Sequence, residues 1–130
     1  MKLIVNIDVP DLAAAEAFYT AAFDLAVTRR FDGVVELTGE SALFHLLEKA
    51  PGTTGAGGDP RRYDRHWSPV HLDILVEDLD MAVDRATAAG ALVERRPPDG
   101  AWGRIANMAD PFGHGFCLIQ LLNRGYDELT

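Results

Sequence analysis

Val-Pro-Asp-Leu-Ala-Ala-Ala at residues 9–15 recurs as Val-Glu-Asp-Leu-Asp-Met-Ala at residues 76–82, an offset of 67 positions. A second matched pair follows, with Phe-His-Leu-Leu-Glu at 44–48 and Phe-Cys-Leu-Ile-Gln at 116–120, at an offset of 72. The order of elements is therefore kept, while the connecting loops differ by about five residues. The chain contains two copies of one unit, and we expect a cleft between them.

Each copy shows the hydrophobic pattern of a strand, a helix and three further strands. Residues 3–9 alternate between apolar and polar side chains, which predicts a strand with one packed face. Asp11 is the expected N-cap of an Ala-rich helix over 12–22, and Asp78 that of a helix reaching about residue 89, with Gly90 as its stop. The remaining strands are expected at 25–29, 34–38, 42–47, 70–76, 92–96, 104–108 and 115–121.

The two copies are expected to share one interior, because a unit of about 60 residues is marginally stable alone. We therefore predict a single domain over residues 1–130. Its parts are a first module at about 1–49, a linker at 50–68, a second module at about 69–121 and a tail at 122–130. The Gly- and Pro-rich stretch at 50–66 is predicted to be a loop, acting either as a surface linker or as a lid.

Composition restricts the compartment and the partners. The chain is 48% hydrophobic and 25% charged, with no apolar run that could span a bilayer and no charged-then-apolar leader. The single Cys117 cannot form an internal disulfide, which fits a reducing compartment. A net charge of −8 argues against a nucleic-acid partner. We expect a cytoplasmic protein without a nucleic-acid or membrane partner.

Strand alternation predicts which side chains line the cleft. Along 70–76, it places His71 and Asp73 on the face opposite the helix, and along 42–47 it does the same for His45. The repeat offset relates Asn6 to Asp73. The offset of 67 also relates Ile4 to His71, and the offset of 72 relates His45 to Cys117.

These features together resemble the vicinal oxygen chelate superfamily. The resemblance covers residues 3–121. It is carried by the doubled strand-helix-strand-strand-strand order, by Val-Pro-Asp-Leu at 9–12 followed by Phe18-Tyr19, and by Asp-Pro-Phe-Gly-His at 110–114. The superfamily includes glyoxalase I, methylmalonyl-CoA epimerase, extradiol dioxygenases, fosfomycin-inactivating transferases and bleomycin-binding resistance proteins. It implies an α+β fold in which two βαβββ modules form an open, curved mixed sheet, the glyoxalase-like barrel. It also implies a homodimer.

The resemblance also implies a metal site at the four related positions. Metal-dependent members commonly carry His, Glu or Gln, His and Glu there, whereas this chain carries Ile4, His45, His71 and Cys117. Isoleucine has no lone pair to donate, so the usual oxygen-rich octahedral site is not kept. The remaining two imidazoles and one thiol suit zinc with an open fourth position. The alternative is that no metal binds.

Other cleft residues receive candidate roles. Asp73 and His45 are the candidate catalytic groups, because the glutamates of the family are missing. Candidate substrate-binding residues are the cleft-facing or loop residues Ile4, Asn6, Asp73, Trp67, Trp102 and Phe112. Each also has an ordinary structural interpretation, for example Cys117 as a small buried hydrophobic side chain.

Three functions remain open from the sequence. The first is a glyoxalase-like or bleomycin-resistance-like protein that acts on a small molecule as a metal-dependent lyase, isomerase or dioxygenase. The second is a metal-free protein that binds and sequesters a drug or metabolite. The third is an auxiliary domain whose cleft is filled by its own side chains.

Overall fold

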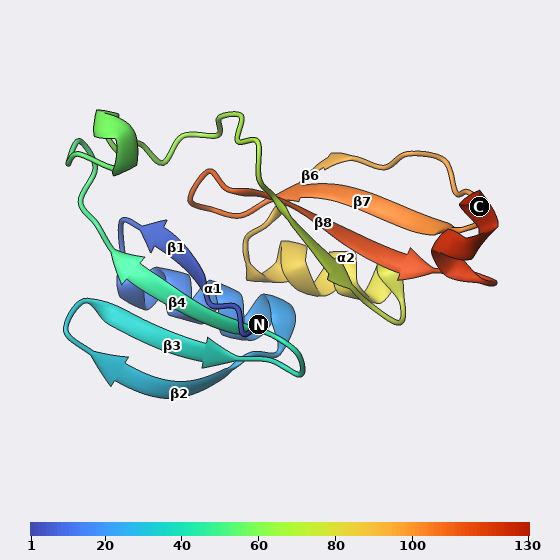
Figure 1. Cartoon of the computed structure of the whole chain (residues 1–130), viewed down its shortest axis with the longest axis horizontal. Helices are drawn as coiled ribbons and strands as arrows, with labels where there is room; N and C mark the ends of the chain where they lie inside the picture. Colours follow the sequence, from blue (N-terminus) through green and yellow to red (C-terminus); the bar gives the residue numbers. More distant parts are fainter. The chain divides into compact units, whose positions relative to one another are not determined.

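Both halves of the chain fold in the predicted order of strand, helix and three strands (Figure 1). The computed structural model describes all 130 residues. The elements of the first half are β1 (Val5–Val9), α1 (Leu12–Phe23), β2 (Ala26–Phe31), β3 (Val34–Thr38), β4 (Leu43–Glu48) and a short 3₁₀ turn, η1 (Ala56–Gly58). Those of the second half are β5 (Leu72–Leu75), α2 (Leu79–Ala89), β6 (Leu92–Arg95), β7 (Gly103–Ala109), β8 (Gly115–Leu121) and η2 (Gly125–Leu129).

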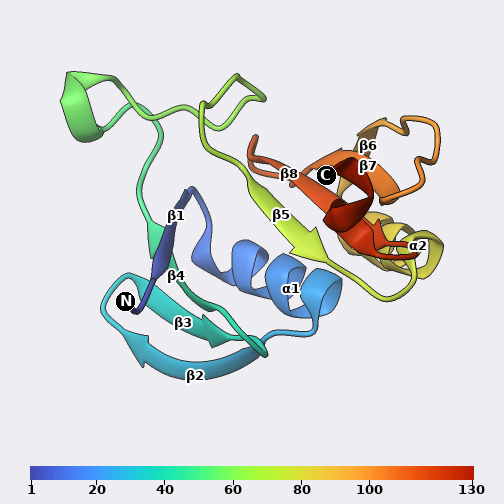
Figure 2. The ribbon, with the colours of Figure 1, turned by 45° about the vertical axis from the view of Figure 1, so that its right-hand side comes forward.

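The two halves have the same sheet topology. The strand orders are β1-β4-β3-β2 and β5-β8-β7-β6, with the first pair of each sheet parallel and the other pairs antiparallel. In each half the helix lies against one face of its own sheet (Figure 2). The predicted α+β fold of two βαβββ modules is confirmed, and each sheet is open rather than closed into a barrel.

The chain divides into two compact units, residues 1–64 and residues 65–130. The boundary lies inside the linker predicted at 50–68. Most of that stretch belongs to the first unit, because Arg61 forms an ion pair with Asp8 of β1 (Nε to Oδ2, 2.7 Å) and Tyr63 donates a hydrogen bond to the Lys49 carbonyl. The predicted loop is thus tied to the module that precedes it.

The helix starts show the duplication at the level of single hydrogen bonds. The side chain of Asp11 accepts from the Ala14 amide, and that of Asp78 accepts from the Met81 amide. The first amide of each helix is also satisfied from the last strand of its sheet. Leu12 N–H donates to Glu48 and Leu79 N–H to Gln120, at 2.9 Å in both cases. These contacts satisfy amides that a helix leaves unpaired at its start.

The core of each unit lies between its helix and its sheet. In the first unit, Val9, Leu37 and Leu46 are fully buried, and in the second the same is true of a larger group. That group is Leu79, Met108 and Leu118, together with Ile119, which by alternation lies on the opposite face of β8 from Leu118. Alternate residues of β4 turn inward, as the period of two requires, so Leu43, His45 and Leu47 belong to the opposite face. Each sheet therefore has one face that its own helix does not cover.

Several features depart from the predicted pattern, among them the start of β1 at Val5 and not at residue 3, and the end of β2 at Phe31 and not at residue 29. Strand β5 begins at Leu72 and not at residue 70, because the Ser68 hydroxyl bonds both the carbonyl and the amide of Val70 and holds a turn before the strand. The edge strands β2 and β6 each carry a β-bulge, with Thr28 and Glu94 as the extra residues. A bulge redirects a side chain that strict alternation would place elsewhere.

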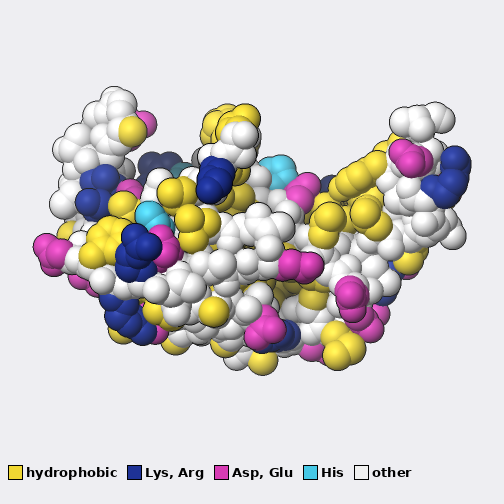
Figure 3. Space-filling model, turned by 60° about the horizontal axis from the view of Figure 1, so that its bottom comes forward, with side chains coloured by type: hydrophobic (Ala, Val, Ile, Leu, Met, Phe, Trp, Pro, Cys, Tyr) yellow, Lys and Arg dark blue, Asp and Glu magenta, His cyan; other side chains and the backbone are white.

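No helix of the chain has the length and apolarity that crossing a membrane requires. The surface carries both signs of charge. On the face shown in Figure 3, acidic and basic side chains are interspersed, although the chain as a whole has a net charge of −8.

Candidate functional site

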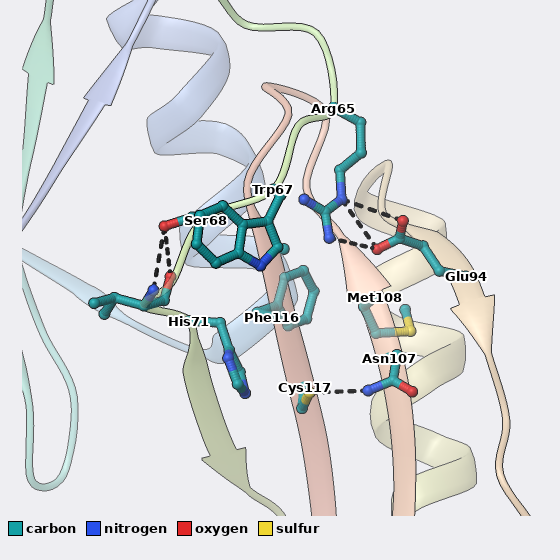
Figure 4. Close-up of a pocket in the computed structure, with 11 residues that line it drawn as sticks. Arg65, Trp67, Ser68, His71, Glu94, Asn107, Met108, Phe116 and Cys117 are labelled. Atoms are coloured by element: carbon teal, nitrogen blue, oxygen red, sulfur yellow. Dashed lines mark hydrogen bonds and ion pairs between the residues drawn. The ribbon is translucent and has the colours of Figure 1, made fainter.

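A pocket of about 300 Å³ lies in the second unit. Its walls come from residues 65–71, which precede β5, and from strands β6, β7 and β8. Figure 4 shows its three parts: an Arg65–Glu94 pair at one end, an apolar middle, and a polar group at the other end. The sequence predicted His71 and Cys117 as site residues, and the cleft that it predicted between the modules stays a prediction.

The polar end combines a histidine, a carboxylate and a thiol. His71 Nε2 lies 3.2 Å from Asp73 Oδ1, and the donor atoms of His71, Asp73 and Cys117 all lie within 4.8 Å of one another. His71 and Asp73 are about half exposed, whereas Cys117 is 6% exposed and forms the floor. The side-chain amide of Asn107, opposite Cys117 on β7, donates a hydrogen bond to its Sγ at 3.1 Å.

The protonation of Cys117 limits what this end can do alone. Burial raises the pKa of the thiol, the nearby Asp73 carboxylate raises it further, and only the hydrogen bond from Asn107 opposes them. A thiol with a raised pKa stays protonated at neutral pH and is a weak nucleophile. The neighbours of Cys117 in the folded chain therefore do not activate it as a nucleophile, whereas a divalent cation would favour the thiolate.

The middle of the pocket is apolar and partly aromatic. Trp67 and Val70 come from the segment before β5, and Met108 and Phe116 from the sheet (Figure 4). Met108 and Phe116 are buried, whereas Trp67 is 80% exposed. The exposed indole of Trp67 is a surface on which a flat ring can stack.

In the first unit, His45 belongs to a different polar group. It pairs in register with Asn6 on β1 and with Glu36 on β3, and its Nε2 lies 3.0 Å from Glu36 Oε2. The ring of Phe31 meets the imidazole edge to face at 5.7 Å. The other oxygen of Glu36 accepts from the Thr28 hydroxyl. The hydrogen bond from His45, and secondarily that from Thr28, lower the pKa of Glu36, which therefore stays ionised.

Sequence reasoning missed Glu36, although a signal existed. Glu36 faces His45 across the β3–β4 hairpin, and paired residues of antiparallel strands share a face. The same argument would have found Asn107 opposite Cys117. In both units, the ligand-facing row thus runs across three strands, as Asn6, His45 and Glu36 in the first and as Asp73, Cys117 and Asn107 in the second.

The predicted site residues fall into three groups. His71, Asp73, Cys117 and Trp67 lie at the pocket or its polar end. Ile4, Asn6 and His45 lie in the first unit, with Ile4 and Asn6 exposed. Trp102 and Phe112 do not line the pocket: Trp102 stacks on Tyr126 of η2 at 5.2 Å, and Phe112 is buried in the turn before β8.

The residues fit one kind of metal site and not another. The four-ligand pattern of the superfamily does not fit, because Ile4 offers no donor atom and the glutamate position is Cys117. The group in the second unit does fit a borderline-soft ion such as zinc, since it supplies one nitrogen, one oxygen and one sulfur donor. His71, Asp73 and Cys117 are therefore the residues that could hold a metal.

The sequence pattern of the glyoxalase-like domain matches residues 4–119, which is most of the chain. The chain belongs to the glyoxalase-like family.

Two relatives show how widely this family occurs. The anthracycline biosynthesis protein DauV of Streptomyces sp. (strain C5) is 31% identical over 119 residues, which cover 90% of this chain and 40% of DauV. An uncharacterized protein of Mycobacterium bovis is 32% identical over 121 residues, covering 86% of this chain and 78% of the relative. This glyoxalase-like chain thus spans less than half of DauV.

Solved structures agree with the family. The fosfomycin resistance protein FosX of Listeria monocytogenes has a TM-score of 0.72 at 17% identity, covering 92% of both chains. A glyoxalase/bleomycin resistance protein/dioxygenase family enzyme of Burkholderia phytofirmans has a TM-score of 0.70 at 19% identity, covering 92% of this chain and 97% of that one. A variant of the Listeria FosX was solved with Mn(II) and dihydroxypropylphosphonic acid. At these identities the likeness establishes the glyoxalase-like fold alone.

Proposed function

We propose that this glyoxalase-like protein binds a small molecule with a flat apolar body and a polar edge in the pocket of its second unit. The observation that carries this proposal is the combination of the apolar wall and the polar end in one pocket of about 300 Å³. Pockets of this size and mixed character are typical of small-molecule sites. Trp67 and Phe116 would contact the ring system, and His71 and Asn107 would contact its polar edge.

A second candidate function is metal-assisted chemistry at the polar end of the same pocket. It is favoured by the three donor atoms within 4.8 Å of one another. A divalent ion bound there would supply Lewis-acid polarisation of a substrate oxygen. Asn107 would donate its hydrogen bond to the Cys117 sulfur, as it does in the present structure. The sequence-based set that included His45 stays a prediction.

The relatives suggest where to look for a ligand. DauV is named for anthracycline biosynthesis, and anthracyclines have a flat fused-ring body. We therefore propose fused-ring aromatic molecules, among them anthracycline aglycones, as the first compounds to test. A homodimer and a cytoplasmic location stay predictions of the family resemblance, and light scattering on the eluted protein would test the first.

Binding is tested by calorimetric titration of these aromatic compounds into the purified protein. We expect binding by the wild-type protein and a loss of about two- to tenfold in affinity with Trp67→Ala, as stacking energies of about 0.5–1.5 kcal/mol suggest. Trp102→Ala is the matched control, because Trp102 lies outside the pocket. Equal affinity loss in both variants, or no binding by the wild-type protein, would contradict the proposal.

The metal candidate is tested with Co(II), which reports a thiolate ligand by a charge-transfer absorption band. We expect a one-to-one complex with that band, lost in Cys117→Ser and weakened in His71→Ala and Asp73→Asn. His45→Gln serves as the control in the other unit. A protein that binds neither Co(II) nor Zn(II), or binds Co(II) without the thiolate band, would exclude this candidate and leave metal-free binding.

A further inference from the structure

The internal repeat shows what the pocket-bearing unit has that the other unit lacks. The two units share strand register, so the paired strand positions of the second unit have counterparts in the first. Gly115 at the start of β8 corresponds to Leu43, and the bulge residue Glu94 corresponds to Thr28. In the second unit both residues contact the same side chain, that of Arg65.

The structure explains a glycine at position 115 by the lack of room for a side chain and not by its backbone conformation. Its φ angle is not in the left-handed region, so another residue could adopt its backbone geometry. A Cβ at this position, however, would lie 2.4 Å from Nη2 and 2.9 Å from Cζ of Arg65. Glycine weakens a strand, and at this position it makes room for the guanidinium group directly against β8.

Glu94 forms an ion pair with the guanidinium group of Arg65. The β-bulge in β6 presents its carboxylate, which accepts from Arg65 Nε at 3.1 and 3.2 Å and lies 3.0 Å from Nη2. Arg65 Nη1 also donates to the carbonyl of His66, within the segment that leads to β5. One side chain therefore joins this segment to β6 and to β8.

The segment that Arg65 anchors carries the aromatic wall of the pocket. We call residues 65–70 the strap. It contributes Arg65, Trp67, Ser68 and Val70 to the pocket, and regular structure resumes only at Leu72. Trp67 and Val70 are 80% and 75% exposed, so contacts of their own side chains with the protein hold them weakly. Their position depends on how the strap is fastened.

We propose that Arg65, Glu94 and Gly115 form a latch, and that Arg65 is the positioning residue that holds Trp67 at the pocket and thereby sets the affinity for flat ligands. This inference rests on the proposed binding function. It differs from a general stabilising role, because the ion pair is partly exposed, at 43% and 36% of its two side chains, and so contributes little to global stability. The effect is local to the strap.

The test measures the strap without a ligand and then with 2-naphthol, a flat bicyclic probe. Amide hydrogen exchange is measured over residues 66–71. Acrylamide quenching of Trp67 is measured in a Trp102→Phe background, which leaves one tryptophan. We expect Arg65→Gln and Glu94→Gln to raise the exchange rates and the Kd for 2-naphthol about two- to fivefold, the factor that a partly exposed ion pair gives. Asp80→Asn, which breaks exposed ion pairs elsewhere in the unit, is the matched control.

Gly115→Ala gives the decisive comparison. In the wild-type background the added methyl group should displace Arg65 and raise strap exchange at least as much as Glu94→Gln. In the Arg65→Gln background it should have no further effect, because the nearest atoms to the new Cβ belong to Arg65. Equal effects in both backgrounds, or unchanged exchange and quenching in every variant, would overturn the latch. Failure of the wild-type protein to bind 2-naphthol while exchange responds as expected would count against the proposed function alone.

Discussion

Asn107 and Cys117 face each other across β7 and β8, and the amide of Asn107 donates to the cysteine sulfur at 3.1 Å. This contact is the one influence that lowers the pKa of a thiol that burial and Asp73 raise. Cys117 is therefore held neutral in the folded chain by its surroundings, whereas in the unfolded chain it ionises near pH 8.5.

The raised pKa of Cys117 predicts a loss of stability at alkaline pH. A group whose pKa is higher in the folded state favours folding fully below its unfolded pKa, and this contribution is lost as the pH rises through the folded value. We expect the free energy of unfolding of the wild-type protein to fall above about pH 8.5. Cys117→Ser should remove part of that fall. Urea unfolding from pH 7 to pH 10 measures it, and identical pH profiles would contradict the prediction.

Glu36 predicts the opposite behaviour in acid. The hydrogen bond from His45, followed by that from Thr28, lowers the pKa of Glu36, so its ionised form favours folding above the unfolded pKa near 4.3. That contribution is lost as the pH falls through the lower folded value. We expect the stability of Glu36→Gln to depend less on pH than that of the wild-type protein as the pH falls from about 6 through the unfolded pKa. Glu40→Gln, at an exposed turn residue, is the control and should follow the wild-type curve.

The sequence could predict the face and the row of the candidate site because strands repeat every two residues. Alternation alone places His71 and Asp73 on the helix-free face, and the repeat offset carries the same reasoning from His45 to Cys117. Comparing opposite residues of the hairpins would have added Glu36 and Asn107. These steps need only local periodicity and the duplicated order of elements.

The rest of the pocket could not be predicted from the periodicity of the sequence. Glu94 reaches the pocket through a bulge, and a bulge breaks the alternation that a sequence pattern relies on. Arg65 and Trp67 lie in a stretch without regular structure, so no pattern distinguished Trp67, which lines the pocket, from Trp102, which stacks on Tyr126. Gly115 was expected only as the first residue of a strand, yet its missing side chain is what admits Arg65.

The duplicated helix caps give a stability prediction for each unit. Asp11 and Asp78 each accept a hydrogen bond from the third residue along the chain, at 2.9 and 3.0 Å. Replacing either by Ala should lower the free energy of unfolding by about 1 kcal/mol, whereas replacement by Asn should cost far less. Chemical denaturation of the four variants measures this. Equal losses for Ala and Asn would show that the side-chain oxygen is not what stabilises the helix start.

Leu46 and Leu118 are core positions related by the repeat offset of 72, so truncating each side chain compares the stability of the two units. Leu46 on β4 and Leu118 on β8 are 0% and 1% exposed, and each lies on the helix-facing side of its own sheet. Leu→Ala at either position should lower the free energy of unfolding by about 2–5 kcal/mol, since it removes buried methyl groups and leaves a cavity. Leu121→Ala is the control at the end of β8, where the side chain is 41% exposed, and it should lower the free energy of unfolding by about 1 kcal/mol or less.

The same variants test whether the two units unfold together. If they do, both core variants will shift one common urea transition. If they unfold separately, Leu46→Ala will shift the transition reported by hydrogen exchange in residues 1–64 and leave that of residues 65–130 unchanged.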